Sequence, residues 1–117
     1  MDLKRLTKSL VLLDKEKGPI LAVIPGDSKL SFNKLKEVTN SKRVRLVPFE
    51  EAEEYSGYPP GATPMIFHKV LMKVVLDKKL TSFDSIFGGG GIRTKILELK
   101  TEDVIKLNNA LVGDIIE

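Results

Sequence analysis

The apolar residues of the chain gather in short runs, which polar or glycine-rich segments separate. The first two runs cover residues 9–13 and 19–24, and each has the length and composition of a strand. Residues 14–18 between them are polar and end in glycine, so the two runs are predicted to form a β-hairpin. Further strands are predicted over residues 44–48, 70–76, 82–87, 93–100 and 110–116.

Three short helices are predicted between these strands. Ser31 is placed to cap a helix over residues 32–38, where apolar residues recur on one face. A second helix is predicted over residues 50–55, and Thr101 is expected to cap a third. Hairpins interspersed with short helices predict an α+β fold in a single compact domain over residues 1–117, rather than a doubly wound parallel sheet.

Residues 57–64 combine glycines and prolines in a way that neither a helix nor a central strand accommodates. They read Gly57-Tyr58-Pro59-Pro60-Gly61-Ala62-Thr63-Pro64. Proline fixes φ and glycine permits close approach of the backbone, so a stiff loop with directed N–H groups is expected. A second glycine segment follows later in the chain, and the two can line one site for an anion or a carbonyl oxygen. The alternatives are a rigid connector for the first segment and a bulge or hairpin tip for the second.

Composition narrows the chemistry. The net charge of +3 permits a polyanionic partner without requiring one. Lys42, Arg43 and Arg45 form a basic cluster that can bind such a partner, and the alternative is that they are an ordinary solvated surface. The chain has no cysteine, which excludes disulfides and thiolate metal sites and favours a reducing cytoplasm. Its one histidine, His68, is expected on a surface loop, and neither a metal nor a cofactor is expected. No apolar run is long enough to cross a bilayer.

Common catalytic motifs are missing from the sequence. It contains no Gly-x-Ser-x-Gly elbow, no Walker-type loop and no dinucleotide fingerprint, and a catalytic triad would have to use His68. The remaining chemistry needs no strong nucleophile from the protein. An aminoacyl ester is already reactive, so backbone N–H groups that stabilise the oxyanion and one lysine that anchors a phosphate or ribose are sufficient.

Six segments, in order, resemble the YbaK/prolyl-tRNA-synthetase-associated editing domains. They are KSLVL at 8–12, LAVIPGD at 21–27, GYPPG at 57–61, VLDxxL at 75–80, GGGG at 88–91 and ILEL at 96–99. The resemblance implies a compact, mixed, largely antiparallel β-barrel with flanking helices. It also implies a freestanding trans-editing deacylase that hydrolyses mischarged tRNA, most often alanine or cysteine on tRNA(Pro).

The resemblance extends to single residues. Lys8 matches the important lysine of the early strand, and Gly61 opens the loop that faces the ester carbonyl; these are the expected catalytic residues. Family loops often read Gly-x-x-x-Pro, whereas this chain has Met65 at that position. The residues expected to bind the substrate are Gly57, Ala62, Thr63, Asp77, Gly88, Gly89, Gly90 and Gly91. Structural alternatives are an aggregation-blocking edge lysine for Lys8 and a turn cap for Asp77.

The expected partners are the tRNA acceptor end, held by Lys42, Arg43 and Arg45, and an aminoacyl-tRNA synthetase, with no membrane partner. Family members usually carry a helical segment ahead of the lysine strand, and seven residues precede Lys8 here. This short form motivates an alternative function, a non-catalytic module that holds tRNA or a synthetase. A nucleotide-binding protein that uses the glycine run is a third hypothesis.

Overall fold

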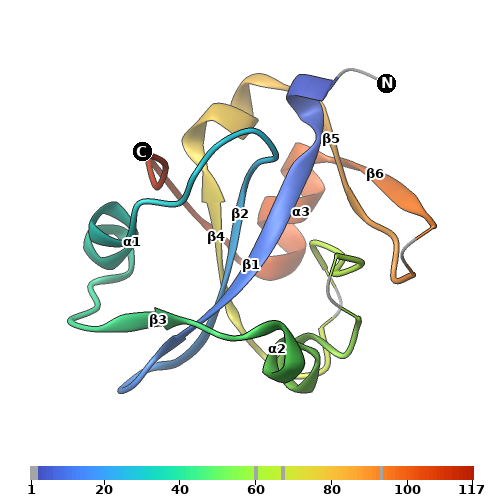
Figure 1. Ribbon diagram of the computed structural model, residues 1–117. Coiled ribbons are helices and arrows are strands. Elements are labelled where there is room, and N and C mark those ends of the chain that lie inside the picture. Colours follow the sequence, from blue (N-terminus) through green and yellow to red (C-terminus); the bar gives the residue numbers. More distant parts are fainter. Residues whose placement is uncertain (1–2, 60, 67, 93) are drawn as a thin grey trace.

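A mixed five-stranded sheet forms the centre of the molecule, in the order β3-β1-β2-β4-β7 (Figure 1). β1 is antiparallel to both β2 and β3, whereas β4 is parallel to both β2 and β7. The strands are β1 (Thr7–Asp14), β2 (Gly18–Pro25), β3 (Val44–Leu46), β4 (Lys73–Asp77) and β7 (Leu111–Gly113). The predicted β-hairpin is confirmed, because Asp14 pairs with Gly18 and the pairing continues to Thr7 and Pro25.

The computed structural model describes residues 3–59, 61–66, 68–92 and 94–117. Position 60 of the predicted loop and position 93 of the predicted strand over 93–100 lie outside the described residues. Among the described residues, no helix is long and apolar enough to cross a membrane.

A separate hairpin, β5 (Ser85–Gly89) with β6 (Ile96–Lys100), stands beside the main sheet. An isolated parallel bridge between Leu6 and Phe87 joins the two sheets ahead of β1. The expected closed β-barrel is wrong, because within the described ranges β3 and β7 form the two open edges of the main sheet. The correct description is an open mixed sheet with an attached hairpin.

Three helices and two 3-10 turns connect the strands. They are α1 (Phe32–Thr39), α2 (Phe49–Ser56), α3 (Thr101–Asn108), η1 (Leu3–Arg5) and η2 (Lys78–Ser82). The predicted cap of α1 is confirmed, since the Ser31 side chain accepts a hydrogen bond from the Lys34 N–H. The predicted cap of α3 is wrong: Thr101 is the first helical residue, and its hydroxyl donates to the Phe83 carbonyl instead.

Several predicted boundaries shift. β4 begins at Lys73, so only the second part of the predicted run over 70–76 is a strand. The run over 82–87 divides between the end of η2 and β5, and the run over 110–116 becomes the three residues of β7 followed by a single bridge from Ile116 to Leu30.

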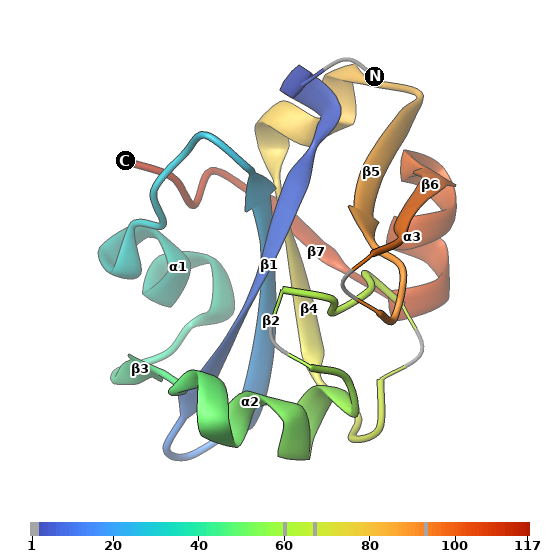
Figure 2. The same ribbon diagram turned by 45° about the vertical axis from the view of Figure 1, so that its right-hand side comes forward.

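The main sheet separates two hydrophobic clusters, because alternate residues of a strand point to opposite faces. On β2, Leu21 and Val23 pack in the cluster that includes residues of α2, α3 and β5. Ile20, Ala22 and Ile24 pack in the other cluster, together with residues of α1 and the C-terminal segment. Figure 2 shows α1 and α3 on opposite sides of the sheet.

Candidate active site

The two glycine segments predicted from the sequence meet in the structure. The N–H of Gly91 donates a hydrogen bond of 3.0 Å to the carbonyl of Ala62. A Cβ on Gly89 would lie 2.5 Å from both the carbonyl carbon of Ala62 and the carbonyl oxygen of Thr63, so this close approach requires glycine. Residues 61–66 and 88–91 are called the glycine junction below, and Figure 2 shows the two segments side by side.

The first segment of the junction starts from a tight turn. Gly61 has a φ of +83°, which favours glycine, and the N–H of Ala62 donates to the carbonyl of Pro59 at 3.0 Å. A Cβ on Gly61 would have no described atom within 4 Å, so the space beside it is open. Gly57 lies outside the junction and ends α2 in a left-handed conformation, a structural position for a residue predicted to bind the substrate.

Three carbonyls in residues 61–66 accept hydrogen bonds from residues outside this segment. Gly91 N–H holds the carbonyl of Ala62, as described above. His68 Nε2 lies 2.7 Å from the carbonyl oxygen of Pro64, and Asn108 Nδ2 donates to the carbonyl of Met65 at 2.7 Å. Among the described residues, no acceptor is found for the N–H groups of Thr63, Met65 and Ile66. The carbonyls of Ala62, Pro64 and Met65 are therefore occupied by hydrogen bonds from the protein, whereas three N–H groups of the same segment find no acceptor among the described residues.

His68 was expected on a surface loop, and it does lie outside the helices and strands. The side chain is half-buried, and burial lowers its pKa below the usual value for histidine, while the bond to Pro64 opposes that shift. Sequence reasoning also missed Asn108, which follows an apolar stretch of α3 and carries no motif. The bond of Asn108 spans 43 residues, so no local signal could indicate it. The bond of His68 spans only four residues, but no sequence motif marks a histidine that bonds an earlier carbonyl.

β1 reaches the junction through Thr7. The Thr7 hydroxyl donates to the Phe87 carbonyl at 2.8 Å and lies 3.7 Å from the sulfur of Met65. Lys8 is the next residue, so its half-buried side chain leaves the strand on the opposite face, the face of Leu10. The structure therefore places Lys8 at the same end of β1 as the junction, and among the described residues no hydrogen bond or ion pair joins its side chain to Gly61.

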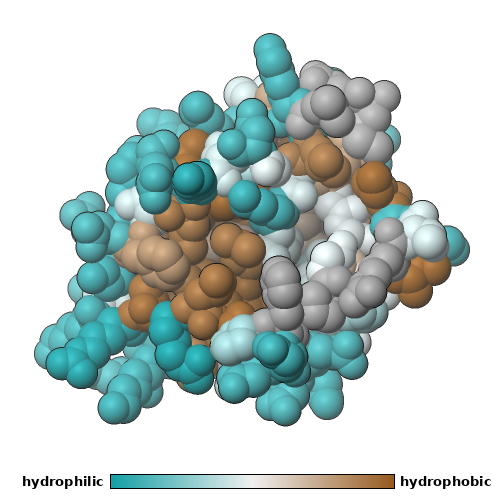
Figure 3. All heavy atoms as spheres, viewed as in Figure 1, coloured by the Kyte–Doolittle hydropathy of each residue, from teal (hydrophilic) through white to brown (hydrophobic). Residues whose placement is uncertain are grey.

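Apolar side chains surround β1 on the face that carries Lys8. Figure 3 shows them gathered over β1 and next to α1. Phe32 on α1 is 42% exposed and Leu46 on β3 is 49% exposed, and the half-buried Leu10 lies on β1. A lysine ammonium that leaves this face has an apolar surrounding on one side and solvent on the other.

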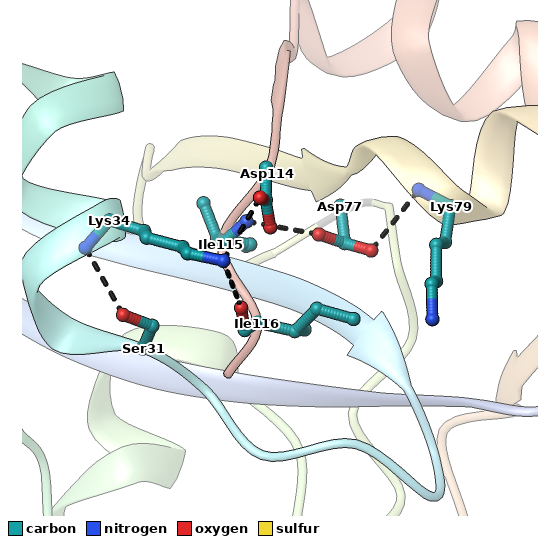
Figure 4. Close-up of polar contacts among 7 residues, drawn as sticks. All are labelled: Ser31, Lys34, Asp77, Lys79, Asp114, Ile115 and Ile116. Atoms are coloured by element: carbon teal, nitrogen blue, oxygen red, sulfur yellow. Dashed lines mark hydrogen bonds and ion pairs between the residues drawn. The ribbon is translucent and has the colours of Figure 1, made fainter.

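Asp77 occupies a second meeting point, the Asp77 junction, where β4, η2 and the C-terminal segment join (Figure 4). One oxygen of its carboxylate accepts the N–H of Ile115 at 3.0 Å, and the other accepts the N–H of Lys79 at 3.1 Å. The residue is 1% exposed. This geometry matches the turn cap that the sequence left as an alternative, and the predicted contact of Asp77 with the substrate gains no support from it.

The basic cluster lies at the far end of β1 from Thr7, roughly 20 Å away at about 3.3 Å per residue. Two adjoining hollows of about 440 and 490 Å³ are lined by Lys15, Lys42, Arg43 and Arg45, and the smaller one also by Asp14 and Glu16. Arg45 also approaches the Glu51 carboxylate at 3.9 Å. This end of the molecule is a cationic surface that is separate from the glycine junction.

Metal chemistry has no obvious centre in the part of the chain that the structure describes. Within it, no group of three or more histidine, aspartate or glutamate side chains is arranged to hold a metal ion. What the glycine junction offers is a set of backbone donors, which suits the stabilisation of negative charge on oxygen.

Comparison with known proteins identifies the family. Residues 1–107 match the model of the aminoacyl-tRNA editing domain. EbsC of Enterococcus faecalis, provisionally named a Cys-tRNA(Pro)/Cys-tRNA(Cys) deacylase, is 29% identical over 111 residues, which cover 95% of this chain and 68% of EbsC. The crystal structure of the hypothetical protein APE2540 is 32% identical with a TM-score of 0.91, and the match covers 100% of this chain and 77% of that protein.

A further crystal structure supports the fold alone, because its sequence is only 23% identical to this chain. It is provisionally described as a trans-editing enzyme for prolyl tRNA synthetase. The TM-score is 0.90, and the match covers 99% of this chain and 73% of that protein. The resemblance to the YbaK/prolyl-tRNA-synthetase-associated domains is thus confirmed. The chain belongs to the family of aminoacyl-tRNA editing domains.

Proposed function

We propose that this protein is a freestanding trans-editing aminoacyl-tRNA deacylase, and that Ala-tRNA(Pro) or Cys-tRNA(Pro) is its substrate. The observation that carries the proposal is the glycine junction, where two glycine segments pack together and backbone N–H groups have no acceptor among the described residues. Family membership and the name of EbsC support the same chemistry. The reaction takes place in the cytoplasm, in keeping with a chain that has no cysteine.

In the proposed reaction, water or a group on the substrate attacks the carbonyl carbon of the aminoacyl ester. Negative charge develops on the carbonyl oxygen, and N–H groups of the junction stabilise it. The bond between the acyl carbon and the ribose oxygen then breaks, and the ribose oxygen takes up the proton that the attacking group loses. Attack by water releases the free amino acid, whereas attack by a group of the amino acid itself releases a cyclic product; the uncharged tRNA leaves in both cases. Gly61 contributes by leaving open space, and Ala62, Thr63 and residues 88–91 form the surface on which the ester lies.

Lys8 has an anchoring role in this proposal. Its ammonium holds the phosphate or ribose of the terminal nucleotide at the end of β1 that carries Thr7, and Thr7 contacts the junction. A positioned charge is sufficient for this role, and no proton transfer through the lysine is needed. Lys42, Arg43 and Arg45 bind the phosphate backbone of the tRNA further along the molecule. A synthetase is a second proposed partner.

The proposal is tested with a panel of mischarged tRNAs under single-turnover conditions. We expect hydrolysis of at least one of them, and a strong loss of rate in Lys8→Ala with the melting temperature within a few degrees of the parent. Lys8→Arg should restore only part of the rate, because the guanidinium is larger and presents its donors in a fixed fork. Lys73→Ala, which removes an exposed strand lysine elsewhere, is the matched control and should change nothing.

Two results would contradict the proposal. Saturable tRNA binding without loss of the ester would indicate a non-catalytic module, and affinity for free nucleotides without tRNA would indicate a nucleotide-binding protein. Equal rates for Lys8→Ala and the parent would remove Lys8 from the mechanism.

A further inference from the structure

We infer that His68 and Asn108 are positioning residues for the deacylation reaction. Neither residue is required to touch the substrate. Each holds one carbonyl of the glycine junction and thereby fixes the direction of the N–H group that follows it. The inference rests on the proposed function, in which these N–H groups stabilise the developing oxyanion.

The bond of His68 has a defined donor. A carbonyl oxygen can only accept, so the hydrogen of this bond lies on Nε2, 2.7 Å from the oxygen of Pro64. Burial lowers the pKa of His68, which favours the neutral imidazole with a single N–H. The one hydrogen of the neutral ring is then used to hold the loop.

Asn108 is held more tightly than an exposed amide would be. Its amide nitrogen donates to Met65 at 2.7 Å and also to the carbonyl of Val104, one turn earlier in α3, at 2.9 Å. Both hydrogens of the amide are therefore used, and the side chain connects the rigid helix to the loop. Asn108 and Met65 are far apart in the sequence, so this connection exists only in the folded chain.

The direction of the free donors follows from peptide geometry. In a trans peptide, the C=O and the following N–H point to opposite sides, and no cis peptide is found among the described residues. Holding the carbonyls of Pro64 and Met65 therefore directs the N–H groups of Met65 and Ile66 away from His68 and Asn108. Gly91 has the same effect on the N–H of Thr63, through the carbonyl of Ala62.

Unpaired donors of this kind are uncommon. Nearly all buried backbone N–H groups in folded proteins have a partner, and Met65 and Ile66 are buried residues. Among the described residues, three N–H groups in residues 63–66 have no acceptor, two of them in buried residues, and each follows a carbonyl that accepts a hydrogen bond. This arrangement indicates a surface prepared for an acceptor from outside the protein. An ester oxygen that gains negative charge is such an acceptor.

The test compares His68→Ala with His68→Gln. The glutamine amide can place an N–H where Nε2 lies, so it restores the bond, whereas alanine removes it. We expect His68→Ala to lower the single-turnover rate by about 10- to 100-fold, since small displacements of groups at a reacting centre have effects of this size. The tRNA dissociation constant should not change, and His68→Gln should recover most of the rate.

Asn108→Ala should lower the rate in the same way. Asn33→Ala, which removes an exposed asparagine from α1, is the matched control and should leave the rate unchanged. The inference is overturned if His68→Ala and Asn108→Ala hydrolyse the ester at the parent rate. It is also overturned if the rate falls but His68→Gln restores none of it at an unchanged melting temperature, because another property of the imidazole would then be responsible.

A second measurement separates this inference from the proposed function. The backbone amide signal of Met65, the N–H that follows the carbonyl held by His68, should shift or broaden in NMR spectra of His68→Ala and return toward the parent position in His68→Gln. An amide signal of Met65 that does not change in His68→Ala would overturn the positioning role. If the parent hydrolyses no mischarged tRNA, the proposed function fails, and this measurement still decides whether His68 fixes the loop.

Discussion

The glycine junction and the Asp77 junction are both places where segments distant in the sequence meet, and they use their hydrogen-bonding groups in opposite ways. At the Asp77 junction a buried carboxylate accepts one N–H from each of two neighbouring segments, so every donor shown there has a partner. At the glycine junction the carbonyls of Ala62, Pro64 and Met65 accept hydrogen bonds, while three N–H groups find no acceptor in the part of the chain that the structure describes. Both regions contributed expected substrate contacts, and only one of them retains atoms that can make such contacts.

The comparison gives a physical criterion for separating a site from its support. A buried polar group that is fully paired within the protein contributes to stability, while a group held in place without a partner is available to a ligand. Substitutions in the two junctions should therefore differ in kind. Those in the Asp77 junction should change the free energy of unfolding, and those in the glycine junction should change the rate.

The largest effect is expected for Gly89→Ala, which should lower both the deacylation rate and the free energy of unfolding. The new Cβ would lie 2.5 Å from backbone atoms of Ala62 and Thr63, so the two segments must separate. We expect a loss of roughly 10²–10³ in deacylation rate, the size of one lost oxyanion donor. Overpacking should cost about 1–3 kcal/mol of stability in addition. Single-turnover kinetics and denaturant unfolding measure the two effects.

Gly113→Ala is the matched control for this substitution. Its Cβ would also be too close to a neighbour, at 2.7 Å, but that neighbour is the Val38 side chain and the site lies in β7. The control should lose stability and keep its rate per folded molecule. A full rate in Gly89→Ala would show that the contact between the two glycine segments is not needed for the chemistry.

Gly61→Ala should reduce the rate with a smaller loss of stability. Its methyl group would enter open space, so it would strain the backbone at φ +83° and intrude on the ester without displacing protein atoms. We expect about a 10²–10³ loss of hydrolysis and little change in tRNA binding. Gly18→Ala at φ +99° has the same kind of strain, about 1–2 kcal/mol, in a turn far from the junction. Equal rates in the two variants would reduce the loop to a connector.

Asp77→Ala should show the opposite behaviour. The buried N–H of Ile115 would lose its acceptor and η2 would lose its cap, which together should lower the free energy of unfolding by about 2–4 kcal/mol. The rate per folded molecule should stay within a few-fold of the parent. Asp114→Ala, which removes an exposed partner of Lys34 and of the Ile116 N–H, should change stability much less. A specific loss of rate in folded Asp77→Ala would return this residue to the substrate site.

The smallest effect per residue is expected at the cationic end of the molecule. Substitutions there should change neither the stability nor the rate, but the salt dependence of tRNA binding. Alanine at Lys42, Arg43 and Arg45 should lower the salt dependence of tRNA binding by about one unit for each lost phosphate contact. The rate at saturating protein should not change. The control removes the same charge from three exposed lysines elsewhere, Lys73, Lys78 and Lys100. An unchanged salt slope would exclude the cluster from the tRNA interface.

Much of the fold could be predicted because its signals are local. The first hairpin follows from two apolar runs and a glycine turn, and the start of α1 follows from Ser31, whose side chain binds an N–H three residues later. Thr101 carries the same kind of signal and behaves differently, because its hydroxyl finds the Phe83 carbonyl across the fold. Local chemistry predicts a cap only when no tertiary partner competes.

The candidate site likewise has parts that the sequence predicts and parts that it does not. The spacing of glycine and proline predicted both segments of the glycine junction, because these residue types themselves determine which backbone conformations are allowed. Asn108 could not be predicted, because its acceptor lies 43 residues away and only the folded chain brings the two together. His68 bonds a carbonyl four residues earlier, but an ordinary carbonyl acceptor leaves no motif in the sequence. The predicted barrel failed for a related reason: whether the last strand of a sheet meets the first depends on strand tilt and spacing, which single runs do not specify.

The place of β7 at the edge of the sheet has a consequence for synthesis on the ribosome. β7 pairs with the exposed edge of β4, and residues 115–117 then bond to Asp77 and to the segment before α1. Until these residues leave the ribosome, the nascent chain carries an unpaired β4 edge with the apolar residues Val75 and Leu76. An open edge of this kind attracts other strands, so the nascent chain is prone to wrong strand pairing in the interval after β4 emerges and before β7 pairs with it.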